Sequence, residues 1–147
     1  MPFQGQWSDS LLAFERVHLI RLMIWAAASI VAGTSLLAWT RVRRADSPLL
    51  SHFAIQNTAW GVLILLASLW SMRGLDLRDL AAATALDRSV WFNSGLSAGV
   101  VALGVVLAGA GWRFGRRLGP VGAGLGIVVQ GMALLVLHLQ FAAALVR

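Results

Sequence analysis

The chain has 147 residues, of which 59% are hydrophobic and only 12% are charged. Soluble domains carry about 25% charged residues, and the mean hydropathy here is +0.77. These values exclude both a water-soluble enzyme with a conventional core and a disordered chain. The sequence contains no cysteine, which excludes disulfides, iron–sulfur clusters, thiolate zinc sites and cysteine nucleophiles. We therefore expect an integral membrane protein with a net charge of +6, its positive side chains all being arginine.

The first apolar run, residues 22–39, is just long enough to cross a membrane as a helix. Apolar residues with helical spacing precede it, together with the charged Asp9, Glu15, Arg16 and Arg21. Acidic residues at this place are not typical of a secretory signal peptide. We predict one helix that starts near Asp9, lies first in the membrane interface and then enters the bilayer.

Three further spans are predicted at residues 49–72, 89–112 and 121–146. Each exceeds the hydrocarbon core of about 30 Å at a rise of about 1.5 Å per residue. Between the second and third spans, residues 73–88 combine leucines with alternating Asp and Arg, which predicts a short helix lying flat on the membrane. The sequence thus predicts an all-α integral membrane bundle of four transmembrane helices, forming one domain over residues 1–147.

Four spans place both termini on one side of the membrane and the loops 40–48 and 113–118 on the other. The two sides carry equal numbers of arginines, but these two loops are short and concentrate theirs, which favours the cytoplasm for them. We expect a multi-pass protein of the bacterial inner membrane with periplasmic termini. The loop arginines are expected to contact anionic lipid headgroups or acidic groups of a partner: Arg41, Arg43, Arg44, Arg113, Arg116 and Arg117.

Small and polar residues inside the spans predict close helix packing. Eleven of the 15 glycines lie between Gly95 and Gly131, and glycine lets helix backbones approach closely. Intramembrane amides most often hydrogen-bond between helices. We expect the packing and interaction residues to be Gln56, Asn57, Trp60, Gly61, Asn93, Gly95, Gly99, Gly122, Gly126, Gln130 and Gly131. Each of the last three spans carries small or polar residues on more than one face, and we infer that the second face contacts another chain.

Histidine is the natural axial ligand for haem or for a pigment magnesium. By depth, His18 lies near the interface, His138 lies deeper on the same side, and His52 is alone on the other side. No two histidines therefore match in depth, and a bis-histidine haem is not expected. Ligation of a pigment or haem by a single histidine, His138 or His52, stays open. No other cofactor, no metal and no nucleic acid is expected.

Coupled transport is disfavoured because no Asp or Glu lies inside the four apolar runs. Glu15 stands just before the first run, close to His18 and to Arg16 and Arg21. We expect these groups to form a solvated network at the interface rather than a coupling site.

Three strings together resemble a known group of proteins. They are His52-Phe-Ala-Ile-Gln56-Asn57-Thr-Ala-Trp60-Gly61, then Trp91-Phe-Asn93-Ser-Gly95-Leu96, then Gly126-x3-Gln130-Gly131. The chain resembles a family of small uncharacterised bacterial four-helix membrane proteins, over about residues 49–141. Members often carry Asp and Tyr beside the third-helix glycines, where this chain has Ser97 and Val100. The resemblance implies a four-helix bundle and no known activity.

We therefore predict a non-enzymatic structural or accessory subunit of a larger bacterial membrane complex, with other membrane subunits and anionic lipids as partners. Energy-converting complexes, photosynthetic or respiratory, are natural hosts. Two alternatives differ in kind: a pigment- or haem-binding protein that uses a transmembrane histidine, and a small carrier or channel.

Overall fold

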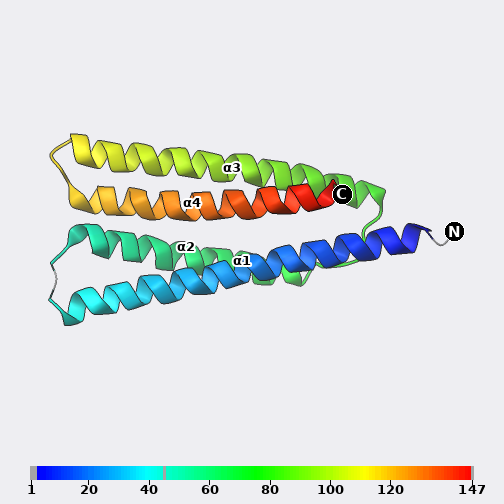
Figure 1. Cartoon of the computed structure of the whole chain (residues 1–147), viewed down its shortest axis with the longest axis horizontal. Coiled ribbons are helices and arrows are strands. Elements are labelled where there is room, and N and C mark those ends of the chain that lie inside the picture. Colours follow the sequence, from blue (N-terminus) through cyan, green and yellow to red (C-terminus); the bar gives the residue numbers. More distant parts are fainter. Residues whose placement is uncertain (1–2, 45, 147) are drawn as a thin grey trace.

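The structure, a computed structural model, describes residues 3–44 and 46–146, with side chains from residue 7 onward. This part of the chain forms four helices and no strand: α1 (Phe3–Val42), α2 (Pro48–Met72), α3 (Leu80–Arg113) and α4 (Leu118–Leu145) (Figure 1). All four are long and apolar enough to cross a membrane. The predicted all-α class with four apolar helices is confirmed.

Local chemistry explains where the helices begin and turn. The Ser47 side chain accepts a hydrogen bond from the Leu50 backbone N–H, and Pro48 follows it at the first helical position of α2. Asp79 caps α3 in the same way, accepting from the Ala82 N–H at 2.8 Å. Between α3 and α4 the chain reverses at Gly115, whose φ of 91° is accessible mainly to glycine.

The prediction of one N-terminal helix that includes the first span is confirmed, but its start and its course differ from the prediction. α1 begins at Phe3 rather than near Asp9, and it continues to Val42 without a separate interfacial segment. Its 40 residues span about 60 Å at about 1.5 Å per residue, and Figure 1 shows a single rod. The physical reason is that residues 7–32 contain neither glycine nor proline, so nothing there breaks the backbone hydrogen bonds.

The predicted flat helix within residues 73–88 is also wrong. The chain turns at Arg73 and Gly74 and runs without regular structure to Asp79. From Leu80 onward it already belongs to α3. Once Asp79 has capped the first turn, no proline or glycine interrupts the chain before the apolar run, so one helix forms instead of two.

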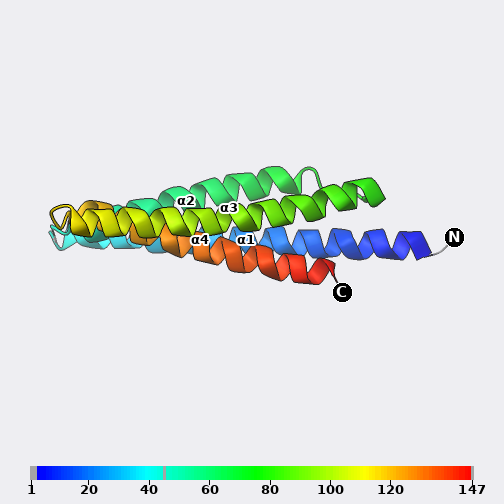
Figure 2. The same cartoon turned by 90° about the horizontal axis from the view of Figure 1, so that it is seen from above.

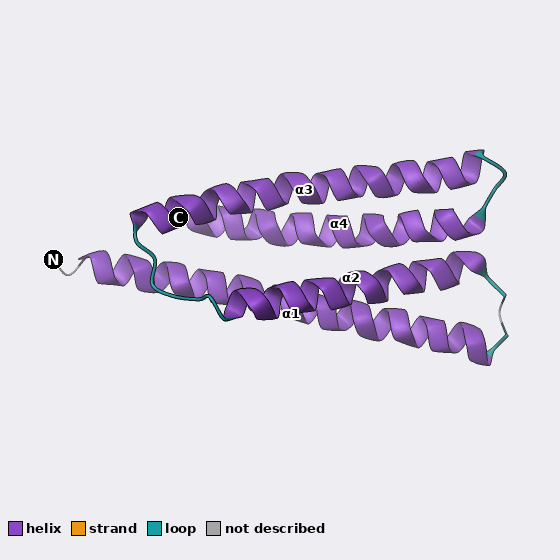
Figure 3. Cartoon of the chain, turned by 180° about the vertical axis from the view of Figure 1, so that it is seen from behind, coloured by secondary structure: helices purple, strands orange, loops and turns teal. Residues whose placement is uncertain are grey.

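The helices form two antiparallel hairpins, α1 with α2 and α3 with α4 (Figures 1 and 3). α4 packs against α3, α2 and α1, whereas α3 makes close backbone contact with α4 alone among the described residues. Figure 2 shows the hairpins from above. The start of α1 and the end of α4 both lie toward the end of the bundle where α2 connects to α3. We call this the terminal end, and we call the opposite end, where α1 is followed by α2 and α3 by α4, the loop end.

Glycines on opposite faces of α4 pack against different helices. A Cβ at Gly122 would collide with the backbone carbonyl of Leu49 on α2, and one at Gly124 would lie 2.5 Å from the Ala108 nitrogen on α3. Gly126 and Gly131 repeat this division toward α2 and α3. Both small faces of α4 are therefore used inside the chain, and the inference that its second face contacts another chain is wrong.

We expect Gly122→Ala to lower the free energy of unfolding by about 1 to 3 kcal/mol, because a backbone atom must move to make room for the methyl group. The matched control is Gly95→Ala, whose Cβ would meet nothing within 4 Å and which we expect to be neutral or slightly stabilising. Reversible unfolding in mixed micelles measures both. Equal stability of the two variants would contradict the assigned packing.

Candidate functional site

A buried amide joins three helices near the middle of the bundle. Gln130 is 0% exposed, and its Oε1 accepts a hydrogen bond of 2.9 Å from the indole N–H of Trp25. Its Nε2 donates to Ser29 Oγ at 3.0 Å and to Asn57 Oδ1 at 2.8 Å. Asn57 in turn donates to the Phe53 carbonyl at 2.9 Å. The network fixes the register of α1, α2 and α4.

The structure brings two of the predicted amides, Asn57 and Gln130, into direct contact. The sequence reasoning missed Trp25 and Ser29. The signal was their spacing of four residues, which places an indole N–H and a hydroxyl on one face of an apolar helix. Gln56 is half-buried and lies near Gly126.

The remaining predicted packing residues differ in how deeply they are buried. Gly61 is buried against α1, where a Cβ would lie 2.9 Å from the Ala26 carbonyl oxygen. Trp60 is half-buried. Gly95 and Gly99 are exposed.

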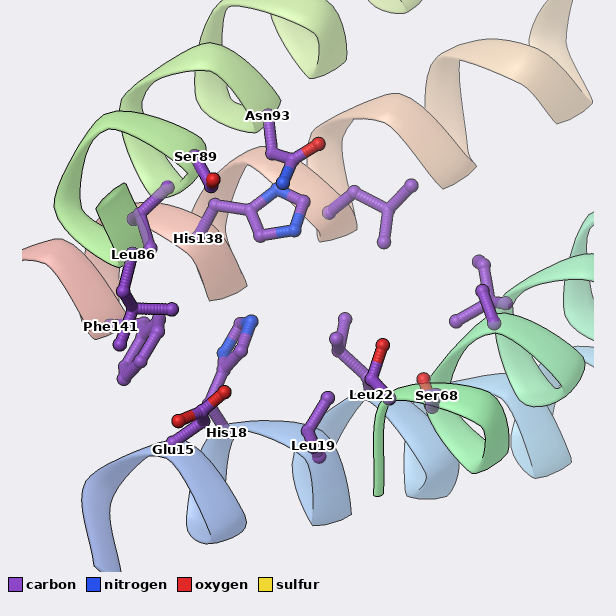
Figure 4. A pocket seen from close by; sticks show the side chains of 15 residues that line it. Glu15, His18, Leu19, Leu22, Ser68, Leu86, Ser89, Asn93, His138 and Phe141 are labelled. Atoms are coloured by element: carbon purple, nitrogen blue, oxygen red, sulfur yellow. The ribbon is translucent and has the colours of Figure 1, made fainter. Parts of the chain in front are cut away.

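A pocket of about 320 Å³ lies near the terminal end, with walls from all four helices (Figure 4). Its polar side chains include Glu15 and His18 from α1, Asn93 from α3 and His138 from α4. Leucine, isoleucine, valine and phenylalanine side chains supply most of the remaining wall. The pocket is the candidate functional site because charged and hydrogen-bonding groups converge in an otherwise apolar cavity.

His18 and His138 face each other across this pocket. Their ring centroids are 5.5 Å apart, and the His18 ring stacks on Phe141 at 4.4 Å with 7° between the planes. The expectation that no two histidines match in depth is therefore wrong. The reason is the continuous α1, which brings His18 beside the last turns of α4 instead of leaving it at the interface.

A serine orients His138. The single hydroxyl hydrogen of Ser97 is donated to the Asn93 carbonyl at 2.8 Å, so Ser97 Oγ can only accept from His138 Nδ1, which lies 3.2 Å away. This network assigns the hydrogen of the neutral ring to Nδ1 and leaves Nε2 as an acceptor.

Glu15 is paired rather than solvated. The Arg78 Nε and Nη2 donate to the two carboxylate oxygens at 2.8 and 2.6 Å, and Glu15 is only 8% exposed. The hydrogen bond from the Arg78 guanidinium to Glu15 raises the pKa of Arg78. This bidentate pair replaces the expected solvated network and holds the 73–79 loop against α1.

The other predicted residues lie away from the pocket. His52 is exposed near the loop end, with Nδ1 2.8 Å from the Pro48 carbonyl. The six loop arginines predicted to contact lipid are exposed, and the Arg116 guanidinium lies 5.4 Å from the centre of the Trp112 ring. Among the described residues, no group of three or more His, Asp or Glu side chains is placed to hold a metal ion.

Residues 21–139 match the model of a family of unknown function (DUF6992). The match covers most of the chain, which therefore belongs to this family, and the predicted resemblance to an uncharacterised family is confirmed. The matched region starts earlier than predicted and includes most of the apolar part of α1. No curated protein and no solved structure matches the chain.

We expect Gln130→Leu to lower the free energy of unfolding by about 1 to 3 kcal/mol, because Trp25, Ser29 and Asn57 lose a buried partner. The control is Gln140→Leu, an exposed glutamine on the same helix, which we expect to be close to neutral. Unfolding in mixed micelles compares them. A loss of similar size in both variants would argue against the network.

Arg78→Met should destabilise the protein by about 1 to 3 kcal/mol, between the values for exposed and buried ion pairs. The change leaves the Glu15 carboxylate buried without its donor. Arg88→Met, at an exposed position of α3, is the control. A double-mutant cycle with Glu15→Gln measures the coupling, and additive effects of the two changes would contradict a direct pair.

Proposed function

We propose that this chain is a non-enzymatic accessory subunit that packs within a larger membrane protein complex through the outer face of α3. One observation carries the proposal. Gly95, Gly99 and Gly109 lie on that face, and a Cβ built on any of them would meet no atom within 4 Å. Ala102 lies between them and is exposed as well.

The exposed glycines contrast with their neighbours on the same helix. Gly104 and Gly111 of α3 both pack closely against α4. Inside a helix, glycine lowers helix stability by about 1 kcal/mol relative to alanine. Contact of the glycine face with lipid does not offset this loss. A second helix gains from glycines four residues apart, because its backbone can approach closely and pack over a larger area. The face therefore suits a transmembrane helix of another protein.

The position of α3 in the bundle supports the same role. α3 contacts α4 alone through its backbone in the described part of the chain, so much of its circumference is uncovered. Large apolar side chains next to the glycine face are exposed, among them Phe92, Leu96 and Val106. In a membrane these side chains can pack on a partner helix or on lipid without a cost in hydration.

The exposed arginines at the loop end complete the proposal. Arg41, Arg43 and Arg44 follow α1, and Arg113, Arg116 and Arg117 lie between α3 and α4. Such clusters attract anionic lipid headgroups or acidic groups of a partner, and they favour the cytoplasmic side of a membrane. We place the loop end in the cytoplasm and both termini on the opposite side of a bacterial inner membrane.

Gly99→Ile tests the partner face, because the branched side chain keeps a second helix at a distance. We expect the variant to fold normally and to lose its partner on purification from the native membrane in mild detergent. The control is Ala32→Ile, at an exposed small residue of α1, which should retain the partner. Mass spectrometry identifies what co-purifies.

Three results would contradict the accessory role. They are a wild-type chain that purifies alone, one that associates only with itself, and an unchanged complex in Gly99→Ile. An absorption spectrum of the same sample tests the alternative role, since a visible band that disappears in His138→Ala or His52→Ala would indicate pigment or haem binding.

A further inference from the structure

We propose that the pocket between the two hairpins binds a neutral, membrane-soluble molecule bearing a hydroxyl group. The hydroxyl donates to Nε2 of His138 beside the Asn93 amide, and His18 binds the second polar atom of the molecule. This site is independent of the partner face on α3.

His138 supplies an acceptor. Because Ser97 takes the Nδ1–H of the neutral ring, Nε2 carries a lone pair and no hydrogen. No described residue donates a hydrogen bond to it, and Figure 4 shows the ring directed into the pocket. A ligand group that pairs with this nitrogen must therefore carry a hydrogen, as a hydroxyl does.

His18 is a buried side chain without a hydrogen bond. It is 8% exposed, and neither ring nitrogen has a hydrogen-bond partner in the described part of the chain. Every fully enclosed nitrogen or oxygen of a described side chain does have such a partner. The free nitrogens of His18 must therefore reach the open space of the pocket, and stacking on Phe141 keeps the ring in that orientation. A bound polar group would remove the cost of leaving them unpaired.

Asn93 completes the polar set. Its side-chain amide makes no hydrogen bond to the described residues and lies beside His138 at the pocket (Figure 4). The amide offers both donors and an acceptor. Because it lies beside His138, the amide can contact the ligand group that pairs with His138, and His18 is left to bind the second polar atom.

The charges around the pocket select a neutral ligand. Glu15 is the one carboxylate in the lining, and Arg78 occupies both of its oxygens. A cation would find no free carboxylate. An anion would find no free guanidinium, because no arginine lines the pocket. Ionic ligands would therefore lose hydration without a matching charge in the wall.

Access to the pocket is from the side. Ala67 and Ser71 of α2 and Ser89 of α3 line it and are exposed, whereas Leu19 and Leu22 of α1 are buried. The mouth therefore lies between α2 and α3, which make no close backbone contact with each other in the described chain. Among membrane helices this mouth faces lipid. The volume of about 320 Å³ lies near the lower limit of small-molecule pockets, which suits a single ring with its tail left in the bilayer.

The test uses the full chain in lipid nanodiscs and decyl-1,4-benzohydroquinone, kept reduced, as the probe. Its dimethyl ether has the same body and tail but no hydroxyl hydrogen. We expect saturable binding of the hydroquinone above that of empty nanodiscs, and at least tenfold weaker binding of the ether. His138→Phe and His18→Phe should each weaken hydroquinone binding at least tenfold. His52→Phe, at the exposed histidine near the loop end, should bind as the wild type does.

A milder variant keeps the test decisive where a histidine variant fails to fold. Ser97→Ala leaves both histidines in place but frees His138 to carry its hydrogen on Nε2, so the preference for hydroquinone over ether should fall at least threefold. Equal binding of hydroquinone and ether to the wild type would overturn the proposal. So would the absence of saturable binding, an unchanged preference in Ser97→Ala, or Zn²⁺ binding at the two histidines in place of the hydroquinone.

Discussion

The bundle depends on α4, the one described helix that packs against each of the other three. It can do so because it carries glycine on two faces, Gly122 and Gly126 toward α2 and Gly124 and Gly131 toward α3. Gly122 and Gly124 lie close to backbone atoms of α2 and α3. Because the helix backbones approach so closely, they make many dispersion contacts, which are weak singly and large in sum. Near the middle of the same helix, Gln130 pairs with α1 and α2 and fixes their register. The close backbone packing at the glycines and the hydrogen bonds of Gln130 therefore both hold the other helices to α4.

The same arrangement leaves two places for other molecules. Because α3 is attached through α4 alone, its outer glycine face stays uncovered, and this carries the proposed contact with another membrane subunit. At the terminal end, the separation of α3 from α2 leaves room for the pocket with its two facing histidines. One constraint, the central position of α4, thus underlies both proposals, although each is tested by different residues and different measurements.

The histidine pair and the Glu15–Arg78 pair show where reasoning by depth fails. Counting residues from the ends of the apolar runs placed Glu15 and His18 at the interface, since the first apolar run starts only at residue 22. The continuous α1 instead extends beside α4, so both side chains are buried. Charge is tolerated there because Arg78 comes from a loop distant in sequence and binds both carboxylate oxygens. The residues around Glu15 in the sequence of α1 do not indicate that Arg78 is its partner.

The sequence by itself determined the four apolar helices, the membership in an uncharacterised family and the inward position of Asn57 and Gln130. Hydropathy and helix-breaking residues act over neighbouring positions, and an amide in an apolar span must find a partner wherever the helix lies. Only the tertiary structure decided that His18 meets His138, that both glycine faces of α4 are covered, and that one face of α3 is not. These outcomes depend on how the helices are placed along and around one another, and that placement is set by contacts between residues far apart in the chain.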